Sequence, residues 1–511
     1  MVSFRDSSVV IIESGRTLIR AGVGLQDLLK APSVEIHARV GLRRNPGDSA
    51  NGASSQTLKP GESNDNLRPS ASSSRASSLP FQPSPSAKVH DYLVGSQLDE
   101  AVEAGQDITI SWPFADGDVR DWTQAEALWK YVLFRTLQLK RTQNESPVML
   151  SMPAGLFRDS SERICQIFFE RFNVAGFGLL DRPMAQLYAA GQLNGVVVDI
   201  GHEITDITPI YDGFILQNAR SSTPLGIRDC QVYLANLLRS NQSVMAAASP
   251  PDKPSDPEVA QRFLDDLVKY VWTEGLVRVP SDGQTVEIPE DEGVTDIAAV
   301  LVAGKEKAVI ETGMKKKLTA KASAAEQARA REIEALDLVT VEFREHSVTL
   351  GKERHRFCEP LFDPTLLNGL PVQRADPYEG RILPLQEAVA FSVRQTDVAQ
   401  RQYIWQGLFV NGDLANHVKG IGAALQSRLA PFILSTPDQA TEVQPRSIRV
   451  LTVPEYFAEY REKGDGFAAF LGTSIVAKIA FNESHGKNFV SKTDYNEKGP
   501  HAVLEMSLAS L

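Results

Sequence analysis

Cysteine is scarce in this chain: its 511 residues include only Cys165, Cys230 and Cys358. Three widely spaced thiols are too few for a disulfide framework or a zinc cluster. The eight histidines also lack the spacing of metal ligands, so no metal site is predicted. This use of cysteine fits a reducing, intracellular compartment.

An excess of positive charge is also missing. Lysine and arginine number 53 against 64 aspartate and glutamate residues, which gives a formal net charge of −11. Proteins that grip DNA directly usually present a basic face, so direct DNA binding is not expected. The sequence has no run of 18 apolar residues, and its start, MVSFRDSSVVIIES, has no signal-peptide pattern. Neither a membrane span nor secretion is therefore predicted.

Two long stretches lack the apolar residues that a folded core needs. Residues 41–88 are rich in Ser, Pro, Asn and Gly, so a disordered insertion is predicted there. A second insertion is expected at about 240–338, where residues 315–338 carry many charges and few apolar side chains. With 42% hydrophobic residues overall, the rest of the chain is long enough for two to four domain-sized units.

Short apolar runs and amphipathic stretches alternate along the remaining sequence, which indicates an α/β fold. Strands are predicted at 6–15, 17–24 and 146–153. A helix is predicted over 119–137, with Asp121 as its N-cap. Further helices are predicted over 159–174, 182–191, 420–433 and 467–481.

Two segments share one plan. SVVIIESGRTLIRAGVG (8–24) and GVVVDIGHEITDITPIYDG (195–213) each contain an apolar strand, a carboxylate-x-glycine, a tight turn and a second strand. Glu13 with Gly15 corresponds to Asp199 with Gly201. Two such hairpins facing one cleft could clasp a nucleotide.

These residues resemble the actin family. GVVVDIGHEITDITPIYDG is similar to the second phosphate hairpin of the family, and TPLGIRDCQVYLANLL to its Gly-Arg-Asp-x-x-x-Tyr-Leu segment. WPFADGDVRDWTQAEALWKYV, VTLGKERHRFCEPLFDP and FVSKTDYNEKGP resemble three further family segments, and all five come in the family's order. Within the family, the long insertions and the C-terminal segments are most similar to divergent nuclear actin-related proteins of fungal chromatin-remodelling complexes.

The resemblance implies an actin fold, with two related α/β lobes, or four subdomains, around a central nucleotide-type cleft. The first lobe is expected over residues 1–194, and the C-terminal segment 467–511 is expected to return to it. The second lobe is expected over residues 195–466.

Members of the family that hydrolyse ATP use two carboxylates around a divalent cation, two hairpins whose N–H groups hold phosphates, and a glutamine that positions water. Several of these positions differ in this chain. Arg182 stands in place of the glutamine, Arg16 in place of a small hydroxyl residue, and Glu203 in place of a glycine. The predicted degenerate cleft is lined by Glu13, Gly15, Arg16, Arg20, Arg182, Asp199, Gly201, His202, Glu203, Gly412 and Asp413.

The added charges predict a cleft that no longer works on nucleotide. Glu203 and Asp413 bring negative charge toward the expected phosphates, and two like charges about 4 Å apart repel by roughly 4 kcal/mol at an effective dielectric constant of 20. Arg16 and Arg182 could pair with the carboxylates of Glu13 or Asp199. We therefore predict a cleft closed by internal ion pairs, without catalytic residues or a bound metal. ATP could enter but is not expected to be hydrolysed. The rival interpretation is that the two arginines hold phosphates in place of the usual cation.

The resemblance then implies a nuclear, non-catalytic scaffold subunit of a SWI/SNF- or RSC-type complex. Its expected partners are a second actin-related protein, as a heterodimer, and a long helix of the remodeller ATPase, with the nucleosome contacted indirectly. Partner contacts are predicted at Phe470, Ile475 and Tyr495. Two alternatives stay open: a nucleotide-binding subunit of an acetyltransferase or histone-exchange complex, and a cytoskeletal protein of the dynactin type.

Overall fold

The computed structural model describes most of the chain outside the two predicted insertions. Residues 44–86, the bulk of the first predicted insertion, lie outside the described residues, and so do residues 281–336 of the second. The described residues are 4–25, 30–43, 87–115, 117–249, 256–280, 337–372, 381–433, 447–482 and 488–506.

A six-stranded sheet forms the centre of the N-terminal lobe. The neighbouring strands β1, β7 and β8 are parallel, whereas β2 pairs antiparallel with β1, and β3 antiparallel with β2. The parallel strands are almost completely buried, as expected for strands covered on both faces. In spatial order the strands are β16 (Val490–Ser491), β8 (Gly176–Asp181), β7 (Pro147–Met152), β1 (Val10–Ser14), β2 (Leu18–Val23) and β3 (Val34–His37).

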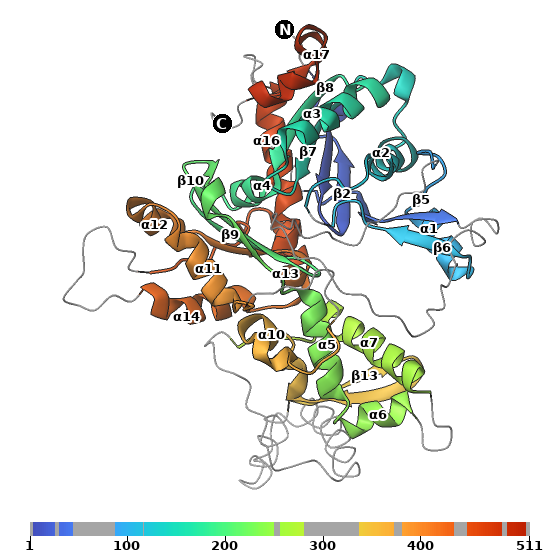
Figure 1. The fold of residues 1–511 in the computed structure, drawn as a ribbon, viewed down its shortest axis with the longest axis vertical. Coiled ribbons are helices and arrows are strands. Elements are labelled where there is room, and N and C mark those ends of the chain that lie inside the picture. The colour runs from blue at the N-terminus through green and yellow to red at the C-terminus, as the bar shows by residue number, and fades with distance from the viewer. Residues whose placement is uncertain are drawn as a thin grey trace, which may run out of the picture.

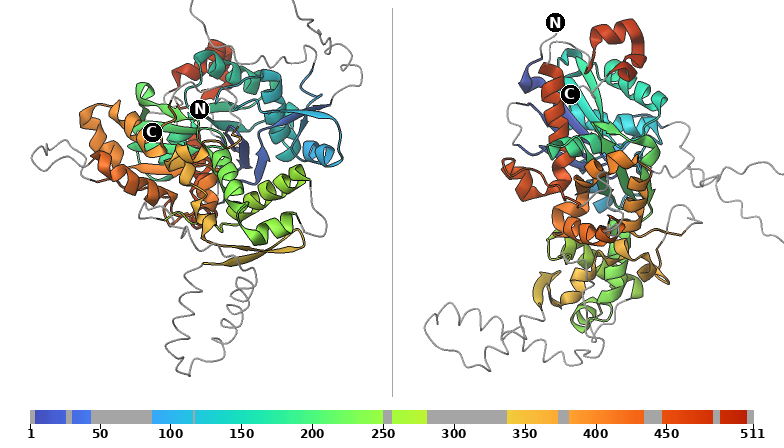
Figure 2. Two further views of the ribbon diagram at one scale, coloured as in Figure 1. Left: turned by 60° about the horizontal axis from the view of Figure 1, so that its bottom comes forward. Right: turned by 90° about the vertical axis from the view of Figure 1, so that its left-hand side faces the viewer.

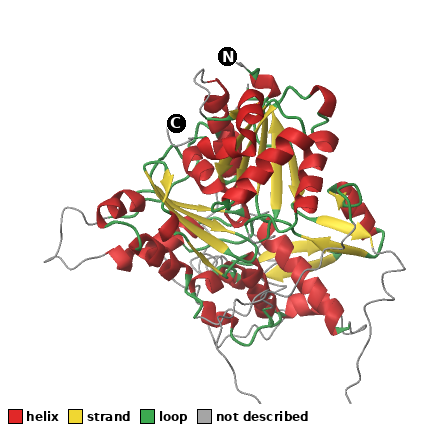
Figure 3. Cartoon of the chain, turned by 45° about the horizontal axis from the view of Figure 1, so that its top comes forward, coloured by secondary structure: helices red, strands yellow, loops and turns green. Residues whose placement is uncertain are grey.

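Helices cover this sheet on both sides (Figure 3). As predicted, the side chain of Asp121 caps the helix that follows it, accepting from the backbone N–H groups of Thr123 and Gln124. Two of the predicted helices end in π-helical turns, at Tyr131–Thr136 and Ile167–Arg171. The helices of this lobe are α2 (Trp122–Lys130), α3 (Arg158–Gln166), α4 (Arg182–Ala189), α16 (Ala468–Asn482) and α17 (Lys492–Lys498).

A small three-stranded sheet projects from the N-terminal lobe. Its strands are β5 (Leu93–Val94), β4 (Val40–Arg43) and β6 (Ile108–Ser111), with helix α1 (Ser96–Glu103) beside them. The prediction of disorder is therefore wrong for residues 41–43, which pair with β6.

The second lobe is built on a sheet with the order β11 (Phe214–Ile215), β10 (Thr205–Tyr211), β9 (Gly195–Ile200) and β15 (Leu408–Asn411), with β12 (Ser221–Thr223) pairing β10. Strands β9 and β10 form the predicted second hairpin, and β15 runs parallel to β9. The helices packed around it are α5 (Ile227–Leu238), α11 (Leu385–Arg394), α12 (Val398–Trp405), α13 (Asp413–His417), α14 (Ile421–Ile433) and α15 (Ala458–Lys463).

The far end of the second lobe corrects the predicted length of the insertion at about 240–338. Two helices, α6 (Gln242–Ala248) and α7 (Pro257–Thr273), lie inside that range, and α7 buries Phe263, Leu267 and Val271 in the lobe's core. They pack with strands β13 (Val339–Phe343) and β14 (His346–Leu350) and with helix α10 (Glu359–Phe362), at the end of the molecule opposite α17 (Figure 1). The amphipathic pattern of α7 belongs to a core helix and not to an insertion.

Two helices join the lobes. Helix α4 leads from β8 of the first sheet to β9 of the second, and α16 packs along α4 and against β1 and β7. One core cluster contains residues from both sheets, such as Ile11 and Val197, together with Leu471 of α16. The lobes therefore share apolar packing, and Figure 2 shows them following one another along the long axis of the molecule. Among the described helices, none is long and apolar enough to cross a bilayer.

Candidate functional site: a cleft between two hairpins

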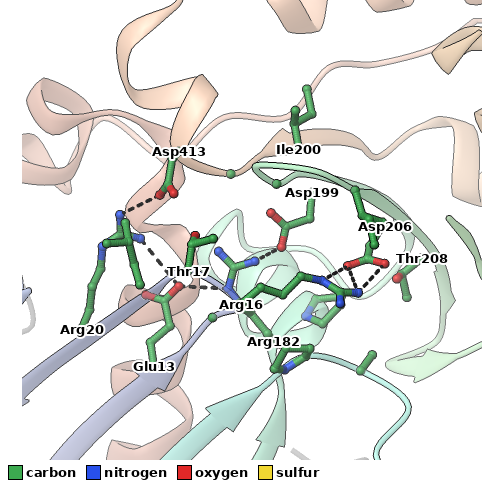
Figure 4. A pocket seen from close by; sticks show the side chains of 18 of the residues that line it. Glu13, Arg16, Thr17, Arg20, Arg182, Asp199, Ile200, Asp206, Thr208 and Asp413 are labelled. Carbon is green, nitrogen blue, oxygen red and sulfur yellow. Dashed lines mark hydrogen bonds and ion pairs between the residues drawn. The ribbon is translucent and has the colours of Figure 1, made fainter. Parts of the chain in front are cut away.

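The two repeated hairpins have the same register and the same turn. Glu13 pairs with Arg20 across β1 and β2, and Asp199 pairs with Asp206 across β9 and β10. In each turn the glycine two residues after the carboxylate donates its N–H to the carbonyl three residues on, at 2.8 Å for Gly15 and 3.0 Å for Gly201. The sequence repeat is therefore a structural repeat, and Figure 4 shows the cleft between the two hairpins.

Glycine is required where the backbones approach most closely. A Cβ atom on Gly201 would lie 2.6 Å from the carbonyl oxygen of Ile204, within the hairpin turn. Gly412 has a φ of +101° and packs directly on the backbone of Ile200, so a side chain there would be both strained and obstructed. These contacts hold the start of α13 against the end of β9.

Nine of the eleven predicted cleft residues line one pocket between the hairpins. Thr17, Ile204, Asp206, Thr208 and Arg220 complete much of its wall, with Pro153 and Ala154 from the loop after β7. The predicted residues in it are Glu13, Gly15, Arg16, Arg20, Arg182, Asp199, Gly201, Gly412 and Asp413.

Arg182 lies between the two cleft carboxylates. It is the first residue of α4, its Nε is 3.0 Å from Oε1 of Glu13, and its Nη1 is paired with Oδ2 of Asp199. The side chains of all three are largely buried, with relative exposures of 12%, 3% and 13%. Gln186, one turn further along α4, donates to the same oxygen of Asp199 at 3.2 Å. The prediction that Arg182 pairs with these carboxylates is confirmed.

Arg20 is the centre of a second group of charges, and its own side chain is more deeply buried than that of Arg182. Its Nε lies 2.7 Å from Glu35, its Nη2 lies 3.2 Å from Asp413, and its Nη1 lies 3.6 Å from Glu13. Nη1 also donates to the carbonyl of Gly466 at 2.8 Å. Burial alone would lower the pKa of the guanidinium, but the three carboxylates outweigh it and raise the pKa above its usual range. Arg20 therefore stays charged.

Arg16 corrects one prediction. It was expected to pair with Glu13 or Asp199, but its guanidinium binds the carboxylate of Asp206, with Nη2 at 2.7 Å from Oδ2. Nη1 of the same guanidinium donates to the carbonyl of Ala115 at 2.9 Å, so the orientation of the Arg16 side chain is fixed from both sides. The turn carries Arg16 toward β10 and away from the carboxylate on its own strand.

The charges of the cleft balance within the protein. Four arginines and four carboxylates line the pocket. In each pair that crosses it, Arg16, Arg20 and Arg182 come from the N-terminal lobe, and the acids Asp206, Asp413 and Asp199 come from the second. The two faces of the cleft are thus electrically complementary and hold each other.

His202 and Glu203 do not line the pocket, although both were predicted to do so. Both side chains are exposed at the turn, and Oε1 of Glu203 lies 2.7 Å from Nη1 of Arg228 at the start of α5. The backbone explains the difference, because the carbonyl of His202 accepts the N–H of Arg228 and ties the turn to that helix. The added negative charge in the cleft comes from Asp206 and Asp413 instead.

Arg220 and Asp181 were not predicted as site residues. Arg220 crosses from the second lobe and donates to the carbonyl of Ala154 at 2.7 Å. Burial raises the pKa of the neighbouring Asp181 carboxyl to about 6, although the charge of Arg220 and the N–H of Gly155 oppose that rise. Neither residue belongs to a sequence motif, and their proximity arises only from the packing of the lobes.

The residues predicted for partner contacts are less accessible than expected. Phe470 is 4% exposed in the core cluster that joins the lobes, so its prediction as a surface residue is wrong. Ile475 packs against the same cluster and is partly buried. The ring of Tyr495 stacks on Phe169 with centroids 4.4 Å apart, and its hydroxyl donates to Glu170. A partner role for Ile475 and Tyr495 stays a prediction.

The nucleotide and cation that the resemblance implies do not fit the residues present. The place between Glu13 and Asp199 is held by a guanidinium, which cannot coordinate a cation. The phosphate side of the cleft carries the Arg16–Asp206 pair, which already satisfies both groups. Among the described residues there is no group of three His, Cys, Asp or Glu side chains arranged to hold a metal ion.

Comparison with known proteins gives the same assignment as the two hairpins. The family model described as Actin matches residues 4–506. The chain is 27% identical to "SWI/SNF and RSC complexes subunit arp9" of Schizosaccharomyces pombe, over 98% of this chain and 99% of that protein. It is 31% identical to "Actin-related protein 2" of Saccharomyces cerevisiae, over 29% of this chain and 37% of that protein. On this match and on its paired hairpins, the chain belongs to the actin family.

Proposed function

We propose that this chain is a non-catalytic actin-related subunit of a SWI/SNF- or RSC-type chromatin-remodelling complex, and that it works in the nucleus. Its similarity to a subunit of those complexes extends over nearly the whole of both chains. The observation that carries the non-catalytic part is the position of Arg182 between Glu13 and Asp199.

An arginine at that position is unsuited to nucleotide hydrolysis. The guanidinium stays protonated in proteins, so it cannot accept a proton from an attacking water, and it offers no oxygen to orient that water. Both carboxylates that would organise a cation are ion-paired with it instead. The ion pairs of the cleft then hold the two lobes in one arrangement, and another subunit of the complex hydrolyses ATP.

The proposed role is that of a scaffold. A second actin-related protein and a long helix of the remodeller ATPase are the proposed partners, with the helix bound through its apolar face in a groove. Contact with the nucleosome would be indirect because the chain is acidic, with a net charge of −11. Through these contacts the subunit would regulate transcription.

Nucleotide binding is tested by thermal unfolding of the purified chain with and without Mg-ATP. A ligand at 100 times its dissociation constant stabilises a protein by about 2.7 kcal/mol, which a nucleotide-binding member of the family would show as a positive control. We expect no shift in Tm for this chain. A dose-dependent rise in its Tm with Mg-ATP would contradict a cleft closed by internal ion pairs and favour the rival interpretation that the arginines hold phosphates.

Membership of a remodelling complex is tested by affinity purification of the tagged chain from its own cells, followed by mass spectrometry. We expect a remodeller ATPase and a second actin-related protein in comparable amounts. Recovery of acetyltransferase, histone-exchange or dynactin subunits in their place would support one of the alternative functions.

A further inference from the structure

We propose that Arg182 is a built-in counter-ion of the cleft: it replaces a divalent cation between Glu13 and Asp199, so that its removal creates a divalent-cation site. This inference rests on the proposed non-catalytic function and explains how the cleft remains closed without a ligand. It also makes the orientation of the lobes independent of nucleotide.

The backbone of Arg182 has a fixed place because it joins a buried strand to a helix. Arg182 follows directly on strand β8 and opens α4, with Pro183 fixing the next backbone φ angle. From there its guanidinium reaches both hairpins, Glu13 on β1 and Asp199 on β9. One guanidinium thus joins two carboxylates that lie far apart in the sequence and belong to different hairpins.

Around Glu13 and Asp199, the buried oxygen acceptors outnumber those that Arg182 satisfies. Oε2 of Glu13 and Oε1 of Gln186 are buried and have no hydrogen-bond partner within the part of the chain that the structure describes. The same holds for Oγ of Ser151 and Oδ1 of Asn411. These side chains are 2% exposed for Glu13 and fully buried for the other three. Buried polar atoms without a partner are uncommon and call for an explanation.

The sheets bring these oxygens to one place. Ser151 pairs with Glu13 between β7 and β1, Asn411 pairs with Asp199 between β15 and β9, and Gln186 donates to Asp199. Carboxylate, amide and hydroxyl oxygens are the ligands that Mg²⁺ and Ca²⁺ prefer. Glu13 and Asp199 therefore lie in oxygen-rich surroundings in which a guanidinium supplies the positive charge.

Removal of Arg182 would leave an unbalanced pair of carboxylates. Glu13 would keep Arg20 at 3.6 Å, but Asp199 would keep only the amide of Gln186 among its described partners. A buried carboxylate that loses its partner is strongly destabilising. A divalent cation can relieve that cost, because it binds both carboxylates at once.

The experiment is thermal unfolding of the full chain and of Arg182→Gln, with EDTA or with millimolar Ca²⁺ or Mg²⁺ and without nucleotide. We expect R182Q to unfold at a lower temperature than the wild type in EDTA and to regain roughly 3 °C or more with Ca²⁺. The wild type should not respond. The matched control, Glu13→Gln combined with Arg182→Gln, should also not respond because it has lost one ligand.

The possible results separate the counter-ion inference from the proposed function. If R182Q is soluble and its Tm does not change with either cation, the counter-ion inference is wrong. The proposed function is still supported in that case, provided that the Tm of the wild type does not change with Mg-ATP. An equal response of wild type and R182Q to Ca²⁺ also overturns the counter-ion inference. If R182Q does not fold even with Ca²⁺, the charge-neutral triple variant Glu13→Gln, Arg182→Gln, Asp199→Asn decides: its folding supports a counter-ion role, and its failure to fold shows that Arg182 acts by packing.

Discussion

Arg16 and Asp206 form a two-pronged ion pair across the mouth of the cleft, although 190 positions separate them in the sequence. Nε of Arg16 lies 3.0 Å from Oδ2, and Nη2 lies 2.9 Å from Oδ1. The two side chains are 19% and 25% exposed, so the pair is shielded from water more than an ordinary surface pair. One residue comes from each hairpin, and the contact therefore links the two lobes.

A double-mutant cycle at this pair should show favourable coupling. We expect Arg16→Ala and Asp206→Ala each to lower the free energy of unfolding, with a coupling energy of about 1 kcal/mol measured by urea denaturation. The control cycle is Arg344 with Asp266, a pair in the second lobe whose side chains are 55% and 48% exposed. A coupling at Arg16 no larger than that of the control would show that the cleft pair adds nothing to the closed state.

Trp129 supports the first hairpin from behind. Its ring is fully buried between Phe114 and Phe168, with centroids 5.4 and 5.5 Å away, and its Nε1 donates to Oγ of Ser14 at 3.0 Å. Replacement by phenylalanine keeps an aromatic ring but leaves the hydroxyl without its donor. We expect Trp129→Phe to lower the free energy of unfolding by about 1–2 kcal/mol and Trp129→Ala by about 3–5 kcal/mol.

The matched control for this prediction is Trp122→Phe. Trp122 is only partly buried, at the start of the same helix, and its ring contacts Arg163. Chemical denaturation should show a smaller decrease in the free energy of unfolding for Trp122→Phe than for Trp129→Phe. A loss at Trp122 equal to or larger than that at Trp129 would mean that the hydrogen bond to Ser14 contributes little.

Local patterns predicted the hairpins well, because each hairpin is specified by nearby residues. An apolar strand, a glycine turn and a return strand determine where Glu13 and Asp199 lie in their own sheets. The cap at Asp121 is of the same kind, since its partners lie two and three residues away. Such features require no knowledge of the rest of the fold.

Contacts between the lobes could not be predicted in this way. Arg16 had several acids of the second lobe within plausible reach, and only the packed lobes show that Asp206 is the nearest. The exposed position of Glu203 likewise depends on the neighbouring α5 and its Arg228. Phe470 did have a signal in the sequence: the helix 467–481 has one charged residue, and a helix that is apolar all round is a buried helix.

Gly472 allows the two helices that join the lobes to touch. A Cβ atom at this position of α16 would overlap the carbonyl of Ala185 on α4. We expect Gly472→Ala to lower the free energy of unfolding by about 1–3 kcal/mol despite the better helix propensity of alanine, because the helices must move apart. Ile479→Ala, at a 38% exposed position of the same helix, is the control and should change it by about 0.5 kcal/mol or less. An unchanged or raised unfolding midpoint for the glycine variant would contradict this packing.

Asp181 should make the stability depend on pH. Its carboxyl pKa is raised to about 6, chiefly by burial, against about 3.9 in an unfolded chain. The folded state therefore binds the proton of this carboxyl more tightly than the unfolded chain does. The stability that this tighter binding provides is fully present below about pH 4 and is lost as the pH rises through 6. At pH 7.5 the ionised carboxylate should cost about 2–3 kcal/mol relative to its protonated form. Asp181→Asn cannot ionise, so we expect it to be more stable than the wild type at pH 7.5.

We expect Asp181→Asn to raise the free energy of unfolding by about 2 kcal/mol over the wild type at pH 7.5. This difference should shrink toward zero as the pH falls to about 4. Urea denaturation of both proteins across this range measures it. Asp212→Asn is the control, because Asp212 is exposed in a left-handed turn that asparagine also accepts. A gain at Asp181 that stayed constant with pH would show that the substitution acts through hydrogen bonding or packing. A loss at pH 7.5 would show that the ionised carboxylate is needed by Arg220, whose side chain binds the loop after β7.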